Sequence, residues 1–414
     1  MIDHSSKKVA IIGQGYVGLP LAINLSTAGW LVYGIDKDED KISNLKNGFS
    51  AISDVSNEQL VNSLNSNLYS PTCDYSKVGE ASVVVICVPT PLGGSSKPDL
   101  SLLNNAIVSI SMYVKDQSLI ILESTSYPGT LRDFIIPLFN KHKKQGVRRV
   151  YFAVSPERVN PADKFWNQRN TPRVIGAIDD ESLNLAQVFY SDICESITTV
   201  SSPEIAEISK LFENTFRLVN ISLVNEFAKA ASSLNLDVYE VLDAAATKPY
   251  GFLRFDPGVG AGGHCIPVDP AYLTWWADNN KQSISLVDKS LEINSLIPNF
   301  VADRAISLIK NFSQHTRILV IGISYKSGVI DCRESPSIAI IETLRSKGIT
   351  VDWHDPFVGS WRDEASSEIN GNYELLILTV NQSGLDYSLL LKCGVTILDC
   401  TRTLTISTGV HSLY

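Results

Sequence analysis

The sequence lacks the long apolar segments that mark a membrane protein. Its apolar runs, such as ASVVVICV at 81–88, are far shorter than the about 20 residues that a membrane-spanning helix needs. The amino-terminal stretch MIDHSSKKVAIIG also lacks the apolar core of a secretory signal peptide. We therefore expect a cytoplasmic protein with no membrane partner.

Cysteine pairs and an excess of positive charge are missing as well. The seven cysteines are scattered without a CxxC pair, which argues against a disulfide framework or a zinc site, so we expect no metal. The 35 Lys and Arg are outnumbered by 44 Asp and Glu, which gives a formal net charge of −9. Because nucleic-acid surfaces are basic, we expect a small-molecule partner and no nucleic acid.

The first motif lies in KKVAIIGQGYVGLPLAINLSTAGWLVYGID, whose pattern predicts strand, tight turn, helix and strand. Gly13, Gly15 and Gly18 form GxGxxG directly after the first apolar run, and Asp36 ends the second. Such glycines allow the turn, the approach of a pyrophosphate and close helix packing, and an acid about 20 residues further on binds the adenosine ribose. The glycines alone would fit any α/β turn, but with the acid they predict an NAD site in preference to NADP.

Apolar runs at 81–91, 117–130 and 149–161 predict further βα units of a parallel sheet. The carboxyl ends of parallel strands line the ligand crevice in such folds. The candidate ligand contacts after these strands are Pro89, Thr90, Thr125 and Glu157. By position alone, Thr125 and Glu157 fit a helix cap or a turn equally well.

A single long helix is predicted over 201–236, with Ser202 as its N-cap and Pro203 in its first turn. Its place in the chain suits a connector between two domains and a subunit interface. Lys210 and Asn214 are four residues apart and share one face of this helix. Spacing alone favours a solvated surface for both.

The segment 315–356 again predicts strand, loop, helix and strand with an acid at the end, and two more strands follow. This is a second doubly wound half without the glycine triplet, in which Lys326, Arg333 and Arg402 are candidates for phosphate contacts or solvated surface. The predicted fold is therefore α/β, with two Rossmann-like doubly wound parallel-sheet domains joined by a long central helix. The expected domains are an NAD-binding domain at 1–200, a central helical domain at 201–300 and a second Rossmann-like domain at 301–414.

Between the central helix and this second half lies GVGAGGHCIPVDP at 258–270, which presents Cys265 after a run of glycines. With GQGYVGLPLA, VPTP, EST, SPE, KLFENTFRLVNISLVNE and YKSGVIDCRESPS, it resembles the UDP-glucose/GDP-mannose dehydrogenase family over essentially the whole chain. The segments ESTSYPGT, SPERVNP and GGHCIPVDPAYLTW are most similar to the UDP-N-acetylglucosamine 6-dehydrogenases.

The resemblance implies NAD-dependent oxidation of the C6 alcohol of a UDP-N-acetylhexosamine, first of all UDP-N-acetylglucosamine, to the uronic acid through a Cys265 thiohemiacetal and thioester. It implies a homodimer through the central helix. The implied catalytic residues are Cys265, Lys210, Asn214, Asp269, Glu157 and Thr125. The implied cofactor contacts are Gly13, Gly15, Tyr16, Val17, Gly18, Asp36, Lys41, Pro89, Thr90, Thr125 and Arg333. The implied substrate contacts are Glu157, Arg158, Lys210, Asn214, Phe255, Gly262, Tyr325, Lys326 and Arg402, the last three at the UDP-sugar domain.

One position departs from the UDP-glucose members of the family. They carry a second glutamate four residues after that of SPE, where this chain has Pro161, and this speaks against UDP-glucose. UDP-N-acetylmannosamine, UDP-N-acetylgalactosamine and UDP-glucose remain alternative substrates. Two further alternatives are a two-electron hydroxyacid-type dehydrogenase, which needs no cysteine, and a non-catalytic NAD-binding protein. The sequence assigns no role to Arg254.

Overall fold

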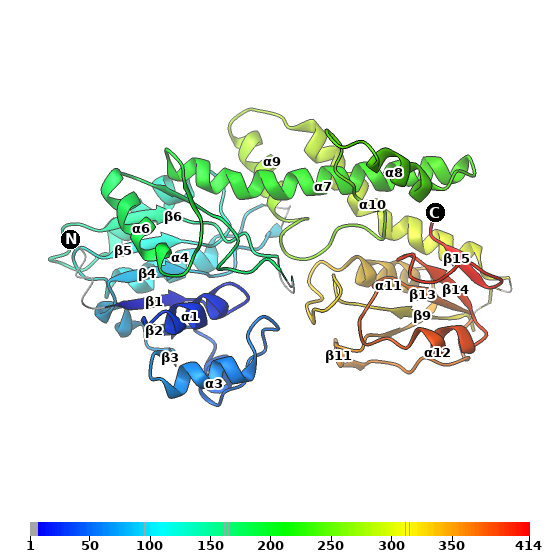
Figure 1. The fold of residues 1–414 in the computed structure, drawn as a ribbon, viewed down its shortest axis with the longest axis horizontal. Helices are drawn as coiled ribbons and strands as arrows, with labels where there is room; N and C mark the ends of the chain where they lie inside the picture. The colour runs from blue at the N-terminus through cyan, green and yellow to red at the C-terminus, as the bar shows by residue number, and fades with distance from the viewer. Residues whose placement is uncertain (1–6, 95–96, 161–162, 164, 311, 314) are drawn as a thin grey trace. The chain divides into compact units, whose positions relative to one another are not determined.

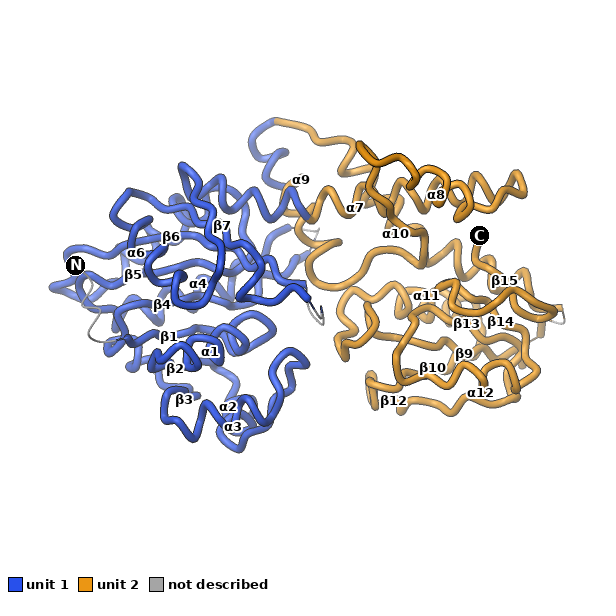
Figure 2. Tube along the Cα trace, viewed as in Figure 1, with its two compact units in different colours: residues 1–213, 275–281 blue, residues 214–274, 282–414 orange. Residues whose placement is uncertain are grey.

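The computed structural model describes residues 7–94, 97–160, 163, 165–310, 312–313 and 315–414. The chain forms two compact units (Figure 2). Unit 1 comprises residues 1–213 and 275–281, and unit 2 comprises residues 214–274 and 282–414. Pro161, where the sequence departs from the UDP-glucose members, lies outside the described residues.

Unit 1 is built on an eight-stranded sheet in the order β3-β2-β1-β4-β5-β6-β7-β8 (Figure 1). Its first six positions follow the strand order of the dinucleotide-binding Rossmann fold. Its strands are β1 (Lys8–Ile12), β2 (Leu31–Ile35), β3 (Tyr69–Thr72), β4 (Val83–Ile86), β5 (Leu119–Leu122), β6 (Tyr151–Val154), β7 (Arg173–Ala177) and β8 (Ile197–Thr199). Its helices include α1 (Gly18–Thr27), α2 (Glu39–Lys46), α3 (Asn57–Asn65), α4 (Ser101–Ser111), α5 (Ile136–His142) and α6 (Asp180–Ser191).

The sheet of unit 1 is buried on both faces. Along β1, Val9 and Ile11 belong to one apolar cluster, whereas Ala10 and Ile12 belong to another. This alternation explains the continuous apolar runs of the sequence, because a parallel sheet covered on both sides has no solvent-facing positions. The predicted βα units are therefore confirmed for this part of the chain.

One strand reverses the direction of the sheet. β7 pairs with β6 in antiparallel register, Ala153 facing Ala177 and Val154 facing Gly176, whereas the other paired strands of this sheet run parallel. The sequence predicted only parallel strands, because a short apolar run carries no mark of its direction. The reversal places the first residue of β7, Arg173, at the edge where β5 and β6 end.

Helix α7 (Pro203–Ser233) begins in unit 1 and ends in unit 2. Ser202 accepts a hydrogen bond from the backbone N–H of Ile205 at 3.4 Å, which confirms the predicted cap. Helix α9 (Asp269–Asn279) also has residues in both units. The other helices of unit 2 are α8 (Val238–Ala246), α10 (Ser285–Ser307), α11 (Pro336–Ser346) and α12 (Tyr387–Lys392).

Unit 2 contains a five-stranded parallel sheet in the order β10-β9-β13-β14-β15. Counted within the unit, this is the 2-1-3-4-5 order of flavodoxin-like sheets, so the second doubly wound half is confirmed. Its strands are β9 (Arg317–Ile321), β10 (Thr350–His354), β13 (Leu375–Leu378), β14 (Thr396–Asp399) and β15 (Val410–Ser412), and β11 (Ser360–Trp361) pairs with β12 (Glu364–Ala365) in a separate hairpin.

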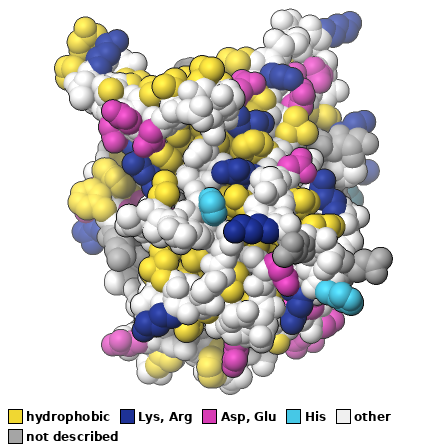
Figure 3. All heavy atoms as spheres, turned by 90° about the vertical axis from the view of Figure 1, so that its right-hand side faces the viewer, with side chains coloured by type: hydrophobic (Ala, Val, Ile, Leu, Met, Phe, Trp, Pro, Cys, Tyr) yellow, Lys and Arg dark blue, Asp and Glu magenta, His cyan; other side chains and the backbone are white. Residues whose placement is uncertain are grey.

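Charged and hydrophobic side chains are interleaved on the molecular face of Figure 3. Within the described residues, every helix is too short or too polar to cross a bilayer.

Candidate active site

The glycine triplet of unit 1 has the geometry of a phosphate-binding turn. Gly13 has φ +95°, and a Cβ there would lie 2.7 Å from the carbonyl oxygen of Cys87. A Cβ on Gly18 would lie 1.9 Å from the carbonyl oxygen of Gly13. A Cβ on Gly15, by contrast, would meet none of the described atoms within 4 Å. The first and third glycines are thus required for packing, and the second leaves the backbone open to a ligand.

Helix α1 begins directly behind this open position. Tyr16 and Val17 are half-buried in the turn, and the N-cap residue Val17 has a hydrocarbon side chain that cannot accept the free N–H groups of the first turn. Free N–H groups at a helix amino terminus bind anions such as a pyrophosphate. The residues of this turn therefore fit the phosphates of NAD.

Asp36 lies beside the same turn and is held as a carboxylate. It accepts hydrogen bonds from the backbone N–H of Gln14 at 2.8 Å and from Lys41 Nζ at 2.8 Å. Burial raises the pKa of Asp36, but the hydrogen bonds from Lys41 and the backbone outweigh burial and hold the pKa below its usual value. Asp36 is thus positioned for a ribose, and Lys41 contacts Asp36 itself.

Thr125 is held between a strand end and helix α7. Its carbonyl oxygen accepts a hydrogen bond from Thr90 Oγ1 at 2.8 Å, next to Pro89 after β4. Its hydroxyl accepts one from Lys210 Nζ at 2.7 Å. Lys210 is only 8% exposed, so the surface interpretation that its spacing favoured is wrong.

The loop after Thr125 is also anchored to α7, by Glu207. This carboxylate accepts hydrogen bonds from the backbone N–H groups of Gly129 at 2.7 Å and Leu131 at 2.9 Å. Burial raises the pKa of Glu207 to about 7 in spite of these two donors. Glu207 therefore joins the ESTSYPGT segment to the helix that carries Lys210.

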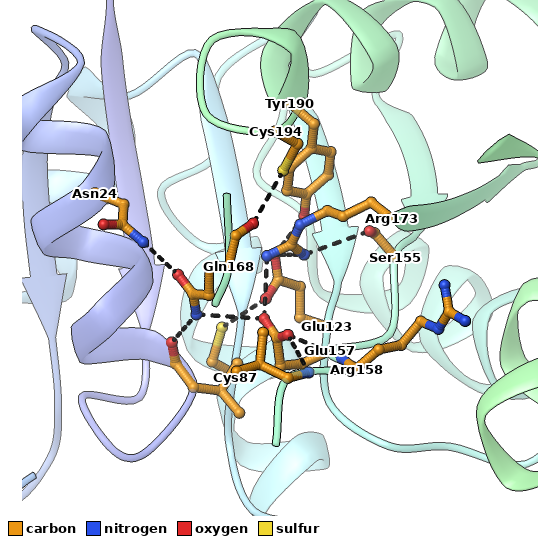
Figure 4. A network of polar contacts seen from close by, with 12 residues as sticks. Asn24, Cys87, Glu123, Ser155, Glu157, Arg158, Gln168, Arg173, Tyr190 and Cys194 are labelled. Atoms are coloured by element: carbon orange, nitrogen blue, oxygen red, sulfur yellow. Dashed lines mark hydrogen bonds and ion pairs between the residues drawn. The ribbon is translucent and has the colours of Figure 1, made fainter. Parts of the chain in front are cut away.

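Glu157 belongs to a buried polar network where β5 and β6 end and β7 begins (Figure 4). Its Oε1 accepts the backbone N–H groups of Arg158 at 2.8 Å and Val159 at 2.9 Å. Its Oε2 accepts Arg173 Nη2 at 3.0 Å and Gln168 Nε2 at 3.3 Å. The side chain of Arg158 is engaged by Glu213 at 2.6 Å and by the carbonyl of Pro172 at 2.7 Å.

In unit 2, Cys265 is half-buried in the turn that leads into α9. The Sγ atom lies 3.7 Å from Nε2 and 3.9 Å from Nδ1 of His264. The first residue of α9, Asp269, donates its backbone N–H to the carbonyl of Cys265 at 2.8 Å. The Asp269 carboxylate accepts Asn214 Nδ2 at 2.6 Å and is 1% exposed. Asp269 therefore contacts the backbone of Cys265 and the side chain of Asn214.

Two asparagines clamp the glycine loop in front of Cys265. Asn225 of α7 accepts the N–H of Gly258 at 2.8 Å. Asn294 of α10 accepts the N–H of Ala261 at 2.7 Å and donates to its carbonyl at 3.0 Å. The loop that carries the thiol is therefore fixed by helices on either side.

The last two glycines of the loop permit close contacts with the second Rossmann-like half. A Cβ on Gly262 would lie 2.5 Å from Cδ of Pro336, and one on Gly263, whose φ is +84°, would lie 2.8 Å from the ring of Tyr325. Lys326 follows Tyr325, and its carbonyl accepts Ser324 Oγ at 3.0 Å. These contacts place Cys265 beside the Tyr325–Lys326 segment.

The remaining predicted residues of unit 2 make contacts of their own. Arg333 forms an ion pair with Asp331 at 2.5 Å. Arg402 lies 4.1 Å from the ring of Tyr239 and 4.0 Å from Asp237, at the start of α8. The ring of Phe255 packs 6.0 Å from that of Phe216. Arg254 pairs with Asp243 and Asp256, which gives it a local structural role.

Arg173, Glu207 and His264 are among the polar residues of these sites that were missed from the sequence. Arg173 and Glu207 act on partners that are distant in the chain, so only the fold shows them. His264 is adjacent to Cys265, and an imidazole beside a thiol could have been noticed in GGHC.

Comparison with known families accounts for all three parts of the chain. Residues 7–194 match the NAD binding domain of the UDP-glucose/GDP-mannose dehydrogenase family, residues 204–296 match its central domain and residues 319–391 match its UDP binding domain.

Individual relatives match over nearly the full length. The UDP-N-acetyl-D-mannosamine dehydrogenase of Methanococcus vannielii is 34% identical over 370 residues, covering 87% of this chain and 82% of the relative. The UDP-N-acetyl-D-glucosamine 6-dehydrogenase of Pseudomonas aeruginosa is 32% identical over 390 residues, covering 91% and 90%. The solved structure of the UDP-D-ManNAc dehydrogenase of Pyrococcus horikoshii superposes with a TM-score of 0.87 at 30% identity, covering 98% and 99%. With its phosphate-binding turn and its anchored cysteine, the chain thus belongs to the UDP-glucose/GDP-mannose dehydrogenase family of NAD-dependent oxidoreductases.

Proposed function

We propose that this protein oxidises the C6 hydroxyl of a UDP-N-acetylhexosamine to the carboxylate. The observation that carries the proposal is Cys265, which lies after a clamped glycine loop and whose backbone carbonyl accepts the N–H of Asp269, the partner of Asn214. A two-electron alcohol dehydrogenase needs no nucleophile. A four-electron oxidation does, because the intermediate aldehyde can release hydride only after a nucleophile has made its carbon tetrahedral.

The thiol accounts for the second oxidation. The Cys265 thiolate adds to the aldehyde carbon, and the thiohemiacetal becomes a thioester on loss of hydride. Water then cleaves the thioester, which releases the uronic acid and restores the thiol. NAD, when bound at Gly13, Gly15, Gly18 and Asp36, supplies the hydride acceptor for both oxidations.

The other polar residues of the proposed site either stabilise negative charge or transfer protons. Lys210 and Asn214 stabilise the developing oxyanion, and Asp269 orients Asn214 and exchanges a proton. Thr125, held by Lys210, orients the water that attacks the thioester, and Glu157 takes the proton of that water. Tyr325, Lys326 and Arg402 contact the nucleotide sugar, whereas Arg333 reaches towards NAD.

The sugar is the open part of the proposal. The sequence put UDP-N-acetylglucosamine first, and the relative from Pseudomonas aeruginosa supports it. Six relatives named UDP-N-acetyl-D-mannosamine dehydrogenase, at 32–35% identity, favour UDP-N-acetylmannosamine more strongly. We therefore propose UDP-N-acetylmannosamine as the first substrate to test and UDP-N-acetylglucosamine as the second.

We further propose a homodimer that forms through α7. This helix exposes large apolar side chains four and seven residues apart, a spacing that places them on one face. They are Phe212, Phe216, Leu223 and Phe227, exposed by 65%, 46%, 61% and 42%. Sedimentation of a monomer at micromolar concentration would refute this proposal. The three-domain division at residues 200 and 300 and the cytoplasmic location are retained as part of the same proposal.

The stoichiometry of NADH tests the function. Purified protein is incubated with excess NAD and a limiting amount of each UDP-N-acetylhexosamine. We expect two NADH for each sugar consumed and the uronic acid as product. One NADH per sugar would show that oxidation stops at the aldehyde, and no NADH with any of the UDP-hexosamines would overturn the proposal.

A further inference from the structure

Three neighbouring strands bring three charged side chains together in unit 1. Glu123 directly follows β5, Glu157 follows β6, and Arg173 is the first residue of β7. They meet because β7 runs antiparallel to β6, so that its beginning lies where the other two strands end (Figure 4). Without this reversal, the first residue of β7 would lie at the opposite edge of the sheet.

Arg173 connects the two carboxylates through separate nitrogens. Its Nη1 donates to Glu123 Oε1 at 2.7 Å, and its Nη2 donates to Glu157 Oε2 at 3.0 Å. The three side chains are 5%, 0% and 9% exposed, and the guanidinium lies 4.4 Å from the ring of Tyr190. A planar fork held at both nitrogens and against a ring fixes the direction of the Glu157 carboxylate.

One of the donors that contact Glu157 can be replaced by water more readily than the others. A carboxylate offers about four acceptor sites, and four donors contact this one. A water that loses its proton to Glu157 must replace one of them. Gln168, at 3.3 Å, is the longest of the four and is also engaged by Asn24 at 2.8 Å, so it is the donor to be displaced. Arg173 then keeps the carboxylate in place.

The charge of the network depends on these three residues. The other titratable groups facing it are Cys87 at the end of β4, Tyr190 of α6 and Cys194 after α6, and burial raises the pKa of each, so they stay neutral. Burial also raises the pKa of Glu123 to about 7. Arg173 is therefore the cation that balances the buried carboxylates.

We propose that Arg173 is a positioning residue for thioester hydrolysis, which holds Glu157 in the orientation needed to take a proton from water. The inference rests on the proposed function, because it concerns the last step of the reaction assigned there. Arg173 acts only through Glu157 and is not itself a catalytic group.

The test is a double-mutant cycle on the hydrolysis step. Arg173→Lys keeps the charge but cannot bridge both carboxylates, and Glu157→Gln removes the base. In rapid-quench experiments, each variant should form two NADH per active site and then stall with Cys265 acylated, as seen by intact mass. Hydrolysis should be slower by about tenfold or more in each. The double variant should be no slower than Glu157→Gln, because groups that act as a unit are not additive.

Matched controls separate this role from a general loss of structure. Arg149→Lys changes an exposed arginine of the same unit, which pairs with Asp179 at 2.7 Å, and should hydrolyse the thioester at the wild-type rate. Wild-type hydrolysis by Arg173→Lys, or effects that multiply in the double variant, would overturn the inference. A wild-type protein that fails to form two NADH per sugar would instead overturn the proposed function.

A second variant applies if Arg173→Lys does not fold. Glu123→Gln preserves the shape of the side chain and removes one negative charge from beside Glu157. Its amide oxygen can still accept Arg173 Nη1, but a neutral acceptor holds the guanidinium less firmly than a carboxylate does, so thioester hydrolysis should be several-fold slower. Hydrolysis at the wild-type rate would overturn the inference, because Glu157 would then not depend on the bridge through Arg173.

Discussion

In both units the first strand of the sheet is followed by a glycine whose N–H donates to the last residue of the neighbouring strand. Gly13 donates to the carbonyl of Ile35 at 2.7 Å, and Gly322 donates to that of His354 at 2.8 Å. The next residue of each second strand is an aspartate that accepts a backbone N–H of the turn. Asp36 accepts that of Gln14 at 2.8 Å, and Asp355 accepts that of Ile323 at 3.0 Å.

The two aspartates differ in their remaining contacts. Asp355 is 3% exposed and also accepts the side chain of Gln382 at 3.2 Å and the backbone N–H groups of Ser324, Phe357 and Val358. Asp36 is bound on its outer side by Lys41, whose side chain is 38% exposed. Asp36 therefore has a partly exposed partner, whereas Asp355 is committed to its own loop. In the proposed function, the acid of unit 1 binds the ribose of NAD, and the acid in the same place of unit 2 stabilises the fold.

The helices that follow the two turns differ as well. Helix α1 begins at Gly18, immediately behind the turn, whereas α11 begins only at Pro336. The turn of unit 1 thus leads directly into a helix, whereas that of unit 2 leads into a long loop that includes Tyr325, Lys326 and Arg333.

The largest effect is expected at the thiol that unit 2 presents beside this loop. Cys265→Ala should abolish formation of the uronic acid. The matched control is Cys332→Ala, because burial raises the pKa of Cys332 to about 12 and keeps that thiol protonated. Product analysis by mass spectrometry measures both. Uronic acid made by Cys265→Ala at the wild-type rate would contradict covalent catalysis.

The next effect concerns the backbone recognition that distinguishes unit 1. In Gly18→Ala, the new Cβ would lie 1.9 Å from the carbonyl of Gly13, so the turn must deform. We expect NAD affinity to fall about a hundredfold, equivalent to ~2.7 kcal/mol. Calorimetric titration with NAD measures this, with Gly258→Ala as control, since a Cβ there meets none of the described atoms within 4 Å. Equal losses in the two variants would mean that the tight turn is not needed.

A pH difference should separate the stabilities of the two units. Burial raises the pKa of Glu207 in unit 1 to about 7, whereas the pKa of Asp331 in unit 2 is lowered, although burial opposes this, mainly by its hydrogen bonds with Arg333. A raised carboxyl pKa stabilises the fold below the unfolded value and the benefit disappears as pH rises through about 7. Unit 1 should therefore lose about 2 to 3 kcal/mol between pH 5 and 8.

Amide hydrogen exchange of β5 against β9 measures this difference. The benefit from Asp331 is lost only at acid pH, below the usual carboxyl range, so β9 should change little. Glu207→Gln should remove about half of the pH dependence from β5, because burial also raises the pKa of Glu123, directly after β5, to about 7. If β5 and β9 respond equally in the wild-type protein, Glu207 does not control the stability of unit 1.

The smallest effects come from the two aspartates and should be of opposite kinds. Asp36→Asn should weaken NAD binding about tenfold, ~1.4 kcal/mol, with little change in thermal stability. Asp355→Asn should lower the free energy of unfolding by about 1 to 3 kcal/mol and leave NAD affinity unchanged, because it removes acceptors from buried donors. Thermal unfolding measures the stability of both variants, and titration measures their NAD affinity. If the two variants change stability and affinity equally, the two aspartates do not have the different roles inferred here.

The sequence sufficed where a local pattern determines the structure. The glycine triplet with Asp36 and the long helix after Ser202 are local, since turn geometry, capping and helical periodicity act over a few residues. Arg173 could not be found in this way. Its importance depends on the direction of β7. That direction results from pairing with β6 and cannot be read from the sequence RVIGA.

Interpretation of individual polar residues was limited for the same reason. Lys210 has the spacing of a surface lysine; the family resemblance implied otherwise, and its burial beside Thr125 shows that it is not at the surface. Asp355 has the position of a ribose ligand, and only its contacts with the loop show that it is committed to the fold. Burial and long-range pairing therefore decide which side chains are available for chemistry.

The clamped loop in front of Cys265 also determines which positions can be substituted in a directed-evolution experiment on sugar preference. Positions 262 and 263 must remain glycine, because a Cβ at either would collide with Pro336 or with the ring of Tyr325. Gly258 has space for a side chain, and Phe255 lies just upstream of it. A library for new sugar acids should therefore randomise 255 and 258 and leave the glycines at 262 and 263 unchanged.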